Sequence, residues 1–234
     1  MPILMKPMVA KQDSVIEEMT KAGLHFGHKT SKTHPKMKPY ISGVRNTVHM
    51  FDLAKTKEKL QKALEYIQSL RTEGKTLLLV GTKIQIKNLV KETATACNLP
   101  YVSERWIGGT FTNFGTIAKR TEYFRGLEQK KAIGELEKYT KKEQLGIAEE
   151  MKNLEMHFGG IKNLAKLPDA VFICDLDKNQ LVLREAKNRG IPVIALVDTN
   201  IDPALVDYVI PANDDAQSSV RYILNKIQEL YVSH

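Results

Sequence analysis

The sequence predicts an α/β fold: a mostly parallel sheet sandwiched by helices, with a protruding coiled-coil helical hairpin. Short apolar runs at residues 76–80, 170–174 and 192–197 have the length and composition of buried strands. Stretches of helical periodicity alternate with these runs, as in parallel sheets covered on both faces. Between Pro100 and Pro168 there is no proline, and apolar residues there form only a narrow stripe. Such a stripe favours two helices that pack on each other.

The N-terminal part predicts one short helix followed by an arm. Ser14 and Glu17 form a capping-box pattern that starts the helix, and Gly23 suits its end. Residues 24–48 show no sustained period, and two prolines favour extended backbone before them. This segment is therefore expected to be an ordered arm or loop. Asp52 can cap a second helix that runs to about Leu70.

The remaining elements follow the strand and helix alternation. The expected strands are 76–80, 101–102, 170–174, 192–197 and 208–210. The expected helices are 84–97, 181–189, which Gly190 is expected to end, and 215–231. In the hairpin, residues 119–155 carry 9 basic and 8 acidic side chains, and its expected seam is Phe114, Ile117, Phe124 and Leu127 against Leu145, Ala148, Met151, Leu154 and Phe158. The alternative is that both helices pack on the sheet.

These elements divide the chain into three expected parts. Residues 1–50 form an N-terminal helix and basic arm, residues 51–110 and 167–234 form the α/β core, and residues 111–166 form the coiled-coil hairpin insertion. The 234 residues are enough for a hydrophobic core, and no apolar run approaches the length that a bilayer requires. The first ten residues resemble neither a secretory signal nor a transit peptide, so a cytoplasmic protein is expected. Cys97 and Cys174 lack metal or redox spacing.

The positive charge is concentrated near the N-terminus. Residues 1–60 hold 11 basic and 5 acidic side chains, whereas residues 171–234 hold 6 and 9. Such a density of cations repels itself unless a polyanion neutralises it, so the arm is expected to bind nucleic acid phosphates. The alternative is a solvated basic face. The candidate contacts in the arm are Lys29, Lys32, Lys36, Lys38 and Arg45.

Two patterns suggest other chemistry, and neither is complete. Asp175 and Asp177, with Thr199 and then Asn213, Asp214 and Asp215, resemble the order of acids in haloacid-dehalogenase-like phosphatases, which use magnesium. The lysine that such enzymes place between the last two elements is missing, because residues 199–213 contain no Lys or Arg. The histidines at 25, 28, 34 and 49 have no Cys or carboxylate at metal-ligand spacing. We therefore expect no catalytic residue, metal, cofactor or small-molecule substrate.

The segment 105–114, RWIGGTFTNF, is unusual for a core. Adjacent glycines allow close backbone approach, Arg105 and Trp106 offer phosphate contact and stacking, and Asn113 can cap a helix. The segment closely resembles the signature of the ribosomal protein S-two family, the universal second protein of the small ribosomal subunit. Further motifs of that family occur in order at 22–28, 35–41, 168–170, 190–193, 197–200 and 210–216.

This resemblance implies a structural, non-enzymatic component of the small subunit in translation, of the bacterial type. Its implied partners are ribosomal RNA and neighbouring proteins, including ribosomal protein S-one, which the family docks in bacteria. Arg105, Trp106, Gly108, Gly109 and Asn113 are expected to seat the base of the hairpin on RNA or on a neighbour. The alternatives are the magnesium-dependent phosphatase and a protein-only scaffold that uses the hairpin.

Overall fold

The computed structural model describes residues 8–232, with side chains from residue 14 onward. It contains a five-stranded sheet in the order β5-β4-β6-β7-β8, and every neighbouring pair of strands is parallel. The strands are β4 (Leu77–Val80), β5 (Tyr101–Val102), β6 (Ala170–Ile173), β7 (Val193–Val197) and β8 (Tyr208–Pro211). All residues of β4, β6 and β7 are buried, as expected for strands covered on both faces. The predicted α/β class is confirmed.

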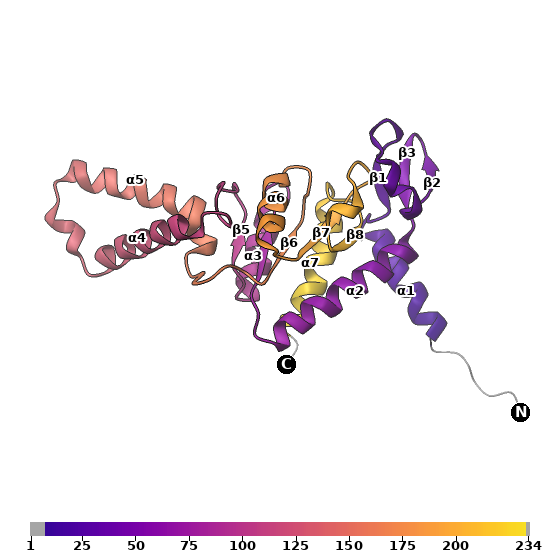
Figure 1. Ribbon diagram of the computed structural model, residues 1–234, viewed down its shortest axis with the longest axis horizontal. Helices are drawn as coiled ribbons and strands as arrows, with labels where there is room; N and C mark the ends of the chain where they lie inside the picture. Colours follow the sequence, from indigo (N-terminus) through magenta and orange to yellow (C-terminus); the bar gives the residue numbers. More distant parts are fainter. Residues whose placement is uncertain (1–7, 233–234) are drawn as a thin grey trace, which may run out of the picture.

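Helices cover the two faces of this sheet (Figure 1). One face packs against α2, α3, α7 and the end of α1 through residues such as Ile67, Val90 and Ile223. The other face packs against α6, the base of the helical pair and part of the N-terminal segment. The helices are α1 (Met8–Lys21), α2 (Leu53–Thr72), α3 (Lys87–Ala96), α4 (Phe114–Ala132), α5 (Lys141–Phe158), α6 (Gln180–Arg189) and α7 (Gln217–Val232).

Local signals fix several helix ends. Asp52 accepts the backbone N–H of Ala54 at the start of α2, and Gly190 ends α6 with a φ of 65°, both as predicted. The first helix differs from its prediction. It begins at Met8, so Ser14 lies inside it and does not cap its start. The sequence also predicts that residues 1–10 are neither a secretory signal nor a transit peptide. Residues 1–7 of this segment lie outside the described part of the chain.

The predicted arm is a small sheet. Residues 26–51 form the strands β1 (Phe26–Lys29), β2 (Ile41–Arg45) and β3 (Val48–Phe51), which pair in the antiparallel order β1-β3-β2. The connection from β1 to β2 contains two short 3-10 turns, Thr30–Lys32 and Pro35–Tyr40. The sequence predicts an ordered arm or loop there but not these strands, because strands of four or five residues, two of them with bulges, leave no extended alternation in the sequence.

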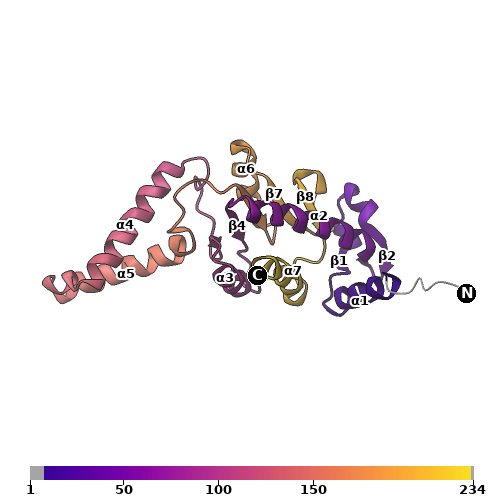
Figure 2. The same ribbon diagram turned by 90° about the horizontal axis from the view of Figure 1, so that it is seen from below.

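The helices α4 and α5 project away from the sheet as a pair (Figures 1 and 2). Near the sheet, their facing side chains are buried, among them Phe124, Leu154 and Phe158. Toward the tip, Leu145 is 73% exposed and Ala148 is exposed, so these two do not lie on the seam as expected. The coiled-coil character of the pair and the division of the chain into three parts stay predictions.

Candidate nucleic-acid interface

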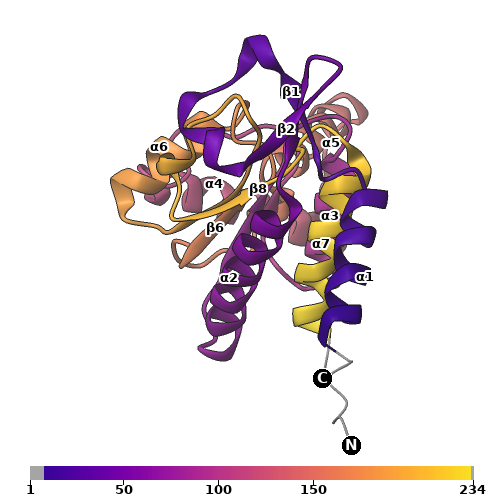
Figure 3. The same ribbon diagram turned by 90° about the vertical axis from the view of Figure 1, so that its right-hand side faces the viewer.

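The small sheet is held against the carboxyl ends of the large sheet (Figure 3). The backbone N–H of His28 donates to the Thr199 hydroxyl, and a Cβ added at Gly27 would lie 2.6 Å from the Thr199 methyl. Phe51 is only 2% exposed and packs into the core, so the face of the small sheet that carries Phe51 is the inner one. We call the opposite face the outer face.

A tight turn joins β2 to β3. Asn46 and Thr47 both have left-handed backbone, with φ of 50° and 64°, the geometry of a two-residue type I′ hairpin. A β-branched residue is strained there. The backbone N–H of Thr30 donates to the Thr47 carbonyl at 2.9 Å, which ties the turn to the start of the arm connection.

Four of the five arm cations face solvent without an acidic partner. Lys29, Lys32, Lys38 and Arg45 are exposed, and no ion pair joins them to any acid among residues 14–232. Lys36 differs, because its Nζ lies 2.6 Å from Asp202 of the core. Lys36 therefore fastens the connection to the large sheet, and the other four cations leave a net positive surface.

The loop 105–113 is organised around one buried carboxylate. Glu185 of α6 is 4% exposed and accepts the backbone N–H groups of Gly109 at 2.8 Å and Phe111 at 2.9 Å. It also accepts the N–H and hydroxyl of Thr112. Four residues further along α6, Arg189 donates to the carbonyls of Phe111 and Thr112. The pair on α6 thus fixes the loop that leads into α4.

Trp106 is not a surface residue. Its side chain is 7% exposed, packs edge-on against Phe111 and donates its indole N–H to Glu185 at 3.3 Å. The expectation that its ring offers stacking to RNA was wrong, because the indole is buried in the core and contacts Glu185 of α6. Gly109 has a φ of 93°, a backbone conformation that favours glycine, so this residue is required by the turn.

Arg105, Gly108 and Asn113 remain at the surface. Asn113 is the N-cap residue of α4, but its amide oxygen accepts the Thr116 hydroxyl and no backbone N–H. The fold does not bring this loop together with the arm. Figure 1 shows the loop at the hairpin side of the molecule and the small sheet at the other end.

A buried ionic cluster lies where the strands of the large sheet end. Nζ of Lys83, which follows β4, lies 2.8 Å from Asp214, 2.8 Å from Asp215 and 3.5 Å from Asp175. Asp175 and Asp214 are 0% and 1% exposed. Carboxyl ends of parallel strands meet at one edge, so residues distant in sequence converge there.

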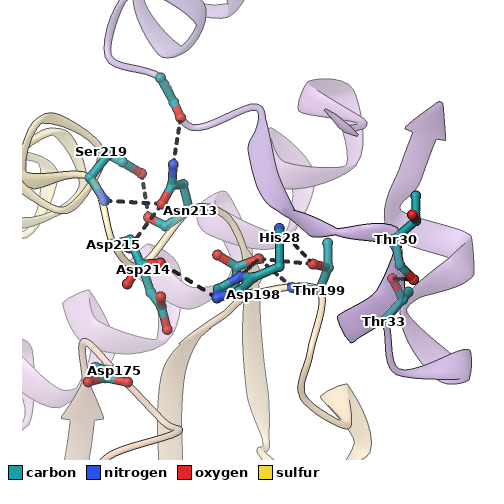
Figure 4. A network of polar contacts seen from close by, with 12 residues as sticks. His28, Thr30, Thr33, Asp175, Asp198, Thr199, Asn213, Asp214, Asp215 and Ser219 are labelled. Carbon is teal, nitrogen blue, oxygen red and sulfur yellow. Dashed lines mark hydrogen bonds and ion pairs between the residues drawn. The ribbon is translucent and has the colours of Figure 1, made fainter. Parts of the chain in front are cut away.

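His28 joins this cluster from the small sheet (Figure 4). Its Nδ1 lies 3.0 Å from Asp198, and its Nε2 lies 3.5 Å from Asp215. No acid stands near His28 in the sequence, so neither partner can be predicted from it. Asp198 and Asp215 lie in the segments 197–200 and 213–215, which contribute to the family resemblance and to the phosphatase alternative but carry no signal of a contact with His28.

The environment shifts the pKa values of this cluster. The hydrogen bond to Asp198 raises the pKa of His28. Burial raises the pKa of Asp214 to about 7, although Lys83 opposes the shift. Burial lowers the pKa of Lys83, but the carboxylates around it outweigh burial and raise that pKa overall. For Glu185, the N–H donors of the loop outweigh burial and lower the pKa of the carboxyl.

The phosphatase alternative is not supported. The fold does supply a lysine beside Asp175, but Lys83 already neutralises the acids that this alternative assigns to magnesium. Asp177 is exposed and does not share the buried site of Asp175. Among the side chains that the structure describes, no group of three or more His, Cys, Asp or Glu is placed to hold a metal ion. Within the same residues, no helix has both the length and the apolar character to cross a bilayer.

Comparison with known proteins gives consistent matches. A family model described as "Ribosomal protein S2" matches residues 19–232. The "Small ribosomal subunit protein uS2" of Coprothermobacter proteolyticus is 43% identical over 214 residues, which cover 92% of this chain and 80% of that protein. The protein of the same name from Roseiflexus sp. is 46% identical over 211 residues, or 90% of this chain and 80% of the relative. The one from Koribacter versatilis is 42% identical over 214 residues, or 92% and 71%.

Proposed function

Because this chain belongs to the ribosomal protein S2 family, we propose that it holds ribosomal RNA through the cations of its small sheet and arm connection. The chain is a structural, non-enzymatic component of the small ribosomal subunit in translation, and its partners are ribosomal RNA and other ribosomal proteins. The residues that contact RNA are the subject of the proposal: Lys29, Lys32, Lys38 and Arg45.

The observation that carries the proposal is the unpaired state of these four cations. Elsewhere in the described chain some lysines have acidic partners, as with Lys62 and Glu58 or Lys162 and Glu128, whereas among the five arm cations of residues 29–45 only Lys36 has one. On the small sheet, the positive charge is left without protein neutralisation. Phosphates gain affinity from such a surface because bound counterions are released when the cations replace them.

Arg105 and Asn113 form a second proposed contact. Both are exposed on a loop that Glu185 and Arg189 hold rigidly, at the base of the projecting pair. Gly108 is also exposed, and a Cβ added there would approach only Leu181, at 3.6 Å. A partner backbone can therefore come close to the chain at this position.

The salt dependence of RNA binding tests the arm assignment. The probe is the small-subunit ribosomal RNA, and the variant replaces Lys29, Lys32, Lys38 and Arg45 by Ala. Each lost phosphate contact should lower the slope of log affinity against log salt by about one unit, with little change of preference among RNAs. The matched control replaces four lysines of the hairpin tip region, Lys130, Lys131, Lys141 and Lys142. An unchanged slope in the arm variant would contradict the assignment.

Docking of ribosomal protein S-one is a further part of the proposal. The far end of the helical pair exposes Ile133 at 75% and Leu145 at 73%, and apolar groups at such a projecting end favour contact with another protein. The test is binding of purified ribosomal protein S-one to the full chain. The variant I133K/L145K should bind at least tenfold more weakly, whereas the four-cation arm variant should bind like the unmodified chain.

A further inference from the structure

The outer face of the small sheet carries two cross-strand rows. In the first row, Phe26 of β1 and Gly43 of β2 lie opposite Met50 of β3. In the second row, Lys29 of β1 and Arg45 of β2 lie opposite Val48 of β3. Residues two apart in a strand point to the same face, so Val48 and Met50 place both rows on one face. In β1, the register shift between Phe26 and Lys29 allows these two residues, three apart, to lie on that same face.

The register places an apolar strip beside a pair of cations. Neighbouring strands are spaced 4.7–4.9 Å apart, so Lys29 and Arg45 start about 10 Å from each other, on either side of Val48. Their long side chains can reach groups above the sheet on both sides. The cations are exposed, and Val48 and Met50 are partly exposed.

The apolar strip is open. Phe26 is 44% exposed, and its ring centroid lies 4.0 Å from that of His25. Burial, and next the charge of Arg45, lowers the pKa of His25, which favours the neutral ring. At Gly43, an added Cβ would have no atom of the protein within 4 Å. The strip therefore offers a flat apolar surface with free space above its β2 end.

We propose that this face binds an unpaired RNA base, which stacks on Phe26 beside Met50, while the adjoining phosphates pair with Lys29 and Arg45. The proposal rests on the RNA contact assigned above and specifies its chemical class. An aromatic ring on a sheet surface, flanked by cations, is the arrangement that single-stranded nucleic acid requires, because each base offers a face for stacking.

A regular duplex fits this face less well. Paired bases in an A-form helix are stacked on each other, so proteins contact the phosphates and 2′-hydroxyls of the duplex. Lys29 and Arg45 would serve such a contact, but Phe26 and Gly43 would have no role in it. Tyr123 of α4 is an exposed aromatic residue outside the small sheet, and its hydroxyl donates to Glu150 on the helical pair. It therefore serves as a control for the loss of an exposed aromatic ring.

The test compares two RNA probes. One is a single-stranded oligoribonucleotide with a central 2-aminopurine, and the other is an A-form RNA duplex of equal phosphate number. The variants of the full chain are Phe26→Leu, which removes the ring, and Gly43→Val, which fills the open space. The control is Tyr123→Leu. Urea unfolding of each variant confirms that it is folded at the assay concentration.

The expected result is quenching of 2-aminopurine by the unmodified chain, and an affinity for the single strand that falls about tenfold in each sheet variant. Affinity for the duplex should change less than twofold, and Tyr123→Leu should behave like the unmodified chain. One outcome is that both sheet variants still quench 2-aminopurine and keep their affinity, while the four-cation variant shows a lower slope of log affinity against log salt. In that case the stacking proposal fails and the phosphate contacts stand. If the four-cation variant also binds as before, the RNA assignment of the arm fails with it. Binding of neither RNA by the unmodified chain overturns both.

Discussion

The carboxylate of Glu185 accepts the backbone N–H of Gly109 at 2.8 Å, across 76 residues of sequence. One carboxylate on α6 thus satisfies the N–H groups of a loop that has little secondary structure of its own. The same α6 packs on the large sheet through Val182 and Ala186. The position of the projecting pair is therefore set by contacts within the core, before any RNA is bound.

Replacing Glu185 by Ala should lower the free energy of unfolding by about 3 kcal/mol, because buried N–H groups would lose a charged acceptor. Urea denaturation measures this change. The control is Glu149→Ala, an exposed position on α5 where a change within about 0.5 kcal/mol is expected. A Glu185 variant as stable as the control would show that the loop does not depend on this carboxylate.

Replacing Lys83 by Met should lower the free energy of unfolding by about 4 kcal/mol, because Asp175 and Asp214 would be left buried without their cation. The comparison is Lys87→Met, which breaks a more exposed pair with Glu104 and should cost less than about 1 kcal/mol. Equal losses in the two variants would contradict the structural role of the cluster.

His28 should make stability depend on pH. Its folded pKa is raised, so its contribution is fully present below the unfolded value of 6.5 and is lost as pH rises through the folded value. The difference in unfolding free energy between the unmodified chain and His28→Gln should thus be larger at pH 5.5 than at pH 8.5. A difference that grows with pH would refute the assigned contact with Asp198.

Asp214 should affect the free energy of unfolding over a lower pH range than His28. Its folded pKa of about 7 lies above the ordinary 3.8, so Asp214 holds its proton longer in the folded chain, and its own contribution to stability falls as pH rises from 4 to 7. The variant Asp214→Asn cannot ionise, and its unfolding free energy should fall less over this range. Urea denaturation at pH 4.5, 5.5, 6.5 and 7.5 checks the slope, and an unchanged slope would rule out this residue as its source.

Two glycines near the hairpin should respond in opposite ways to alanine. A Cβ added at Gly160 would clash with the Tyr101 carbonyl oxygen, so Gly160→Ala must displace β5 or the helical pair and should cost about 2 kcal/mol. Gly146 lies inside α5 with nothing within 4 Å, so Gly146→Ala should raise stability by about 1 kcal/mol. Thermal unfolding of both variants tests the pair, and a shift of the same sign in both would contradict this account.

Sequence reasoning succeeded where a local pattern decides the structure. Buried apolar runs gave the strands of the large sheet, and Asp52 and Gly190 marked helix ends by capping rules that act within a few residues. It failed for the small sheet, where pairing between residues 26–51 depends on bulges and a tight turn.

The ionic cluster was out of reach for a different reason. His28, Lys83 and Asp214 are separated by more than 50 residues each, and only the strand order of the fold brings them together. Trp106 was misassigned because its residue type suits both a surface contact and a core, and the decisive partner, Glu185, lies 79 residues away. The concentration of positive charge in the arm can be read from the sequence alone, whereas the ion pair of Lys36 with Asp202 cannot.

Both margins of the large sheet are short strands that contact other elements. At one margin β5 has only two residues and is covered by the turn Gly159–Ile161, and at the other β8 ends in Pro211 and lies against α2. A newly synthesised copy that has not yet met its RNA therefore presents only short strand edges there, and short edges disfavour pairing with a strand of another copy.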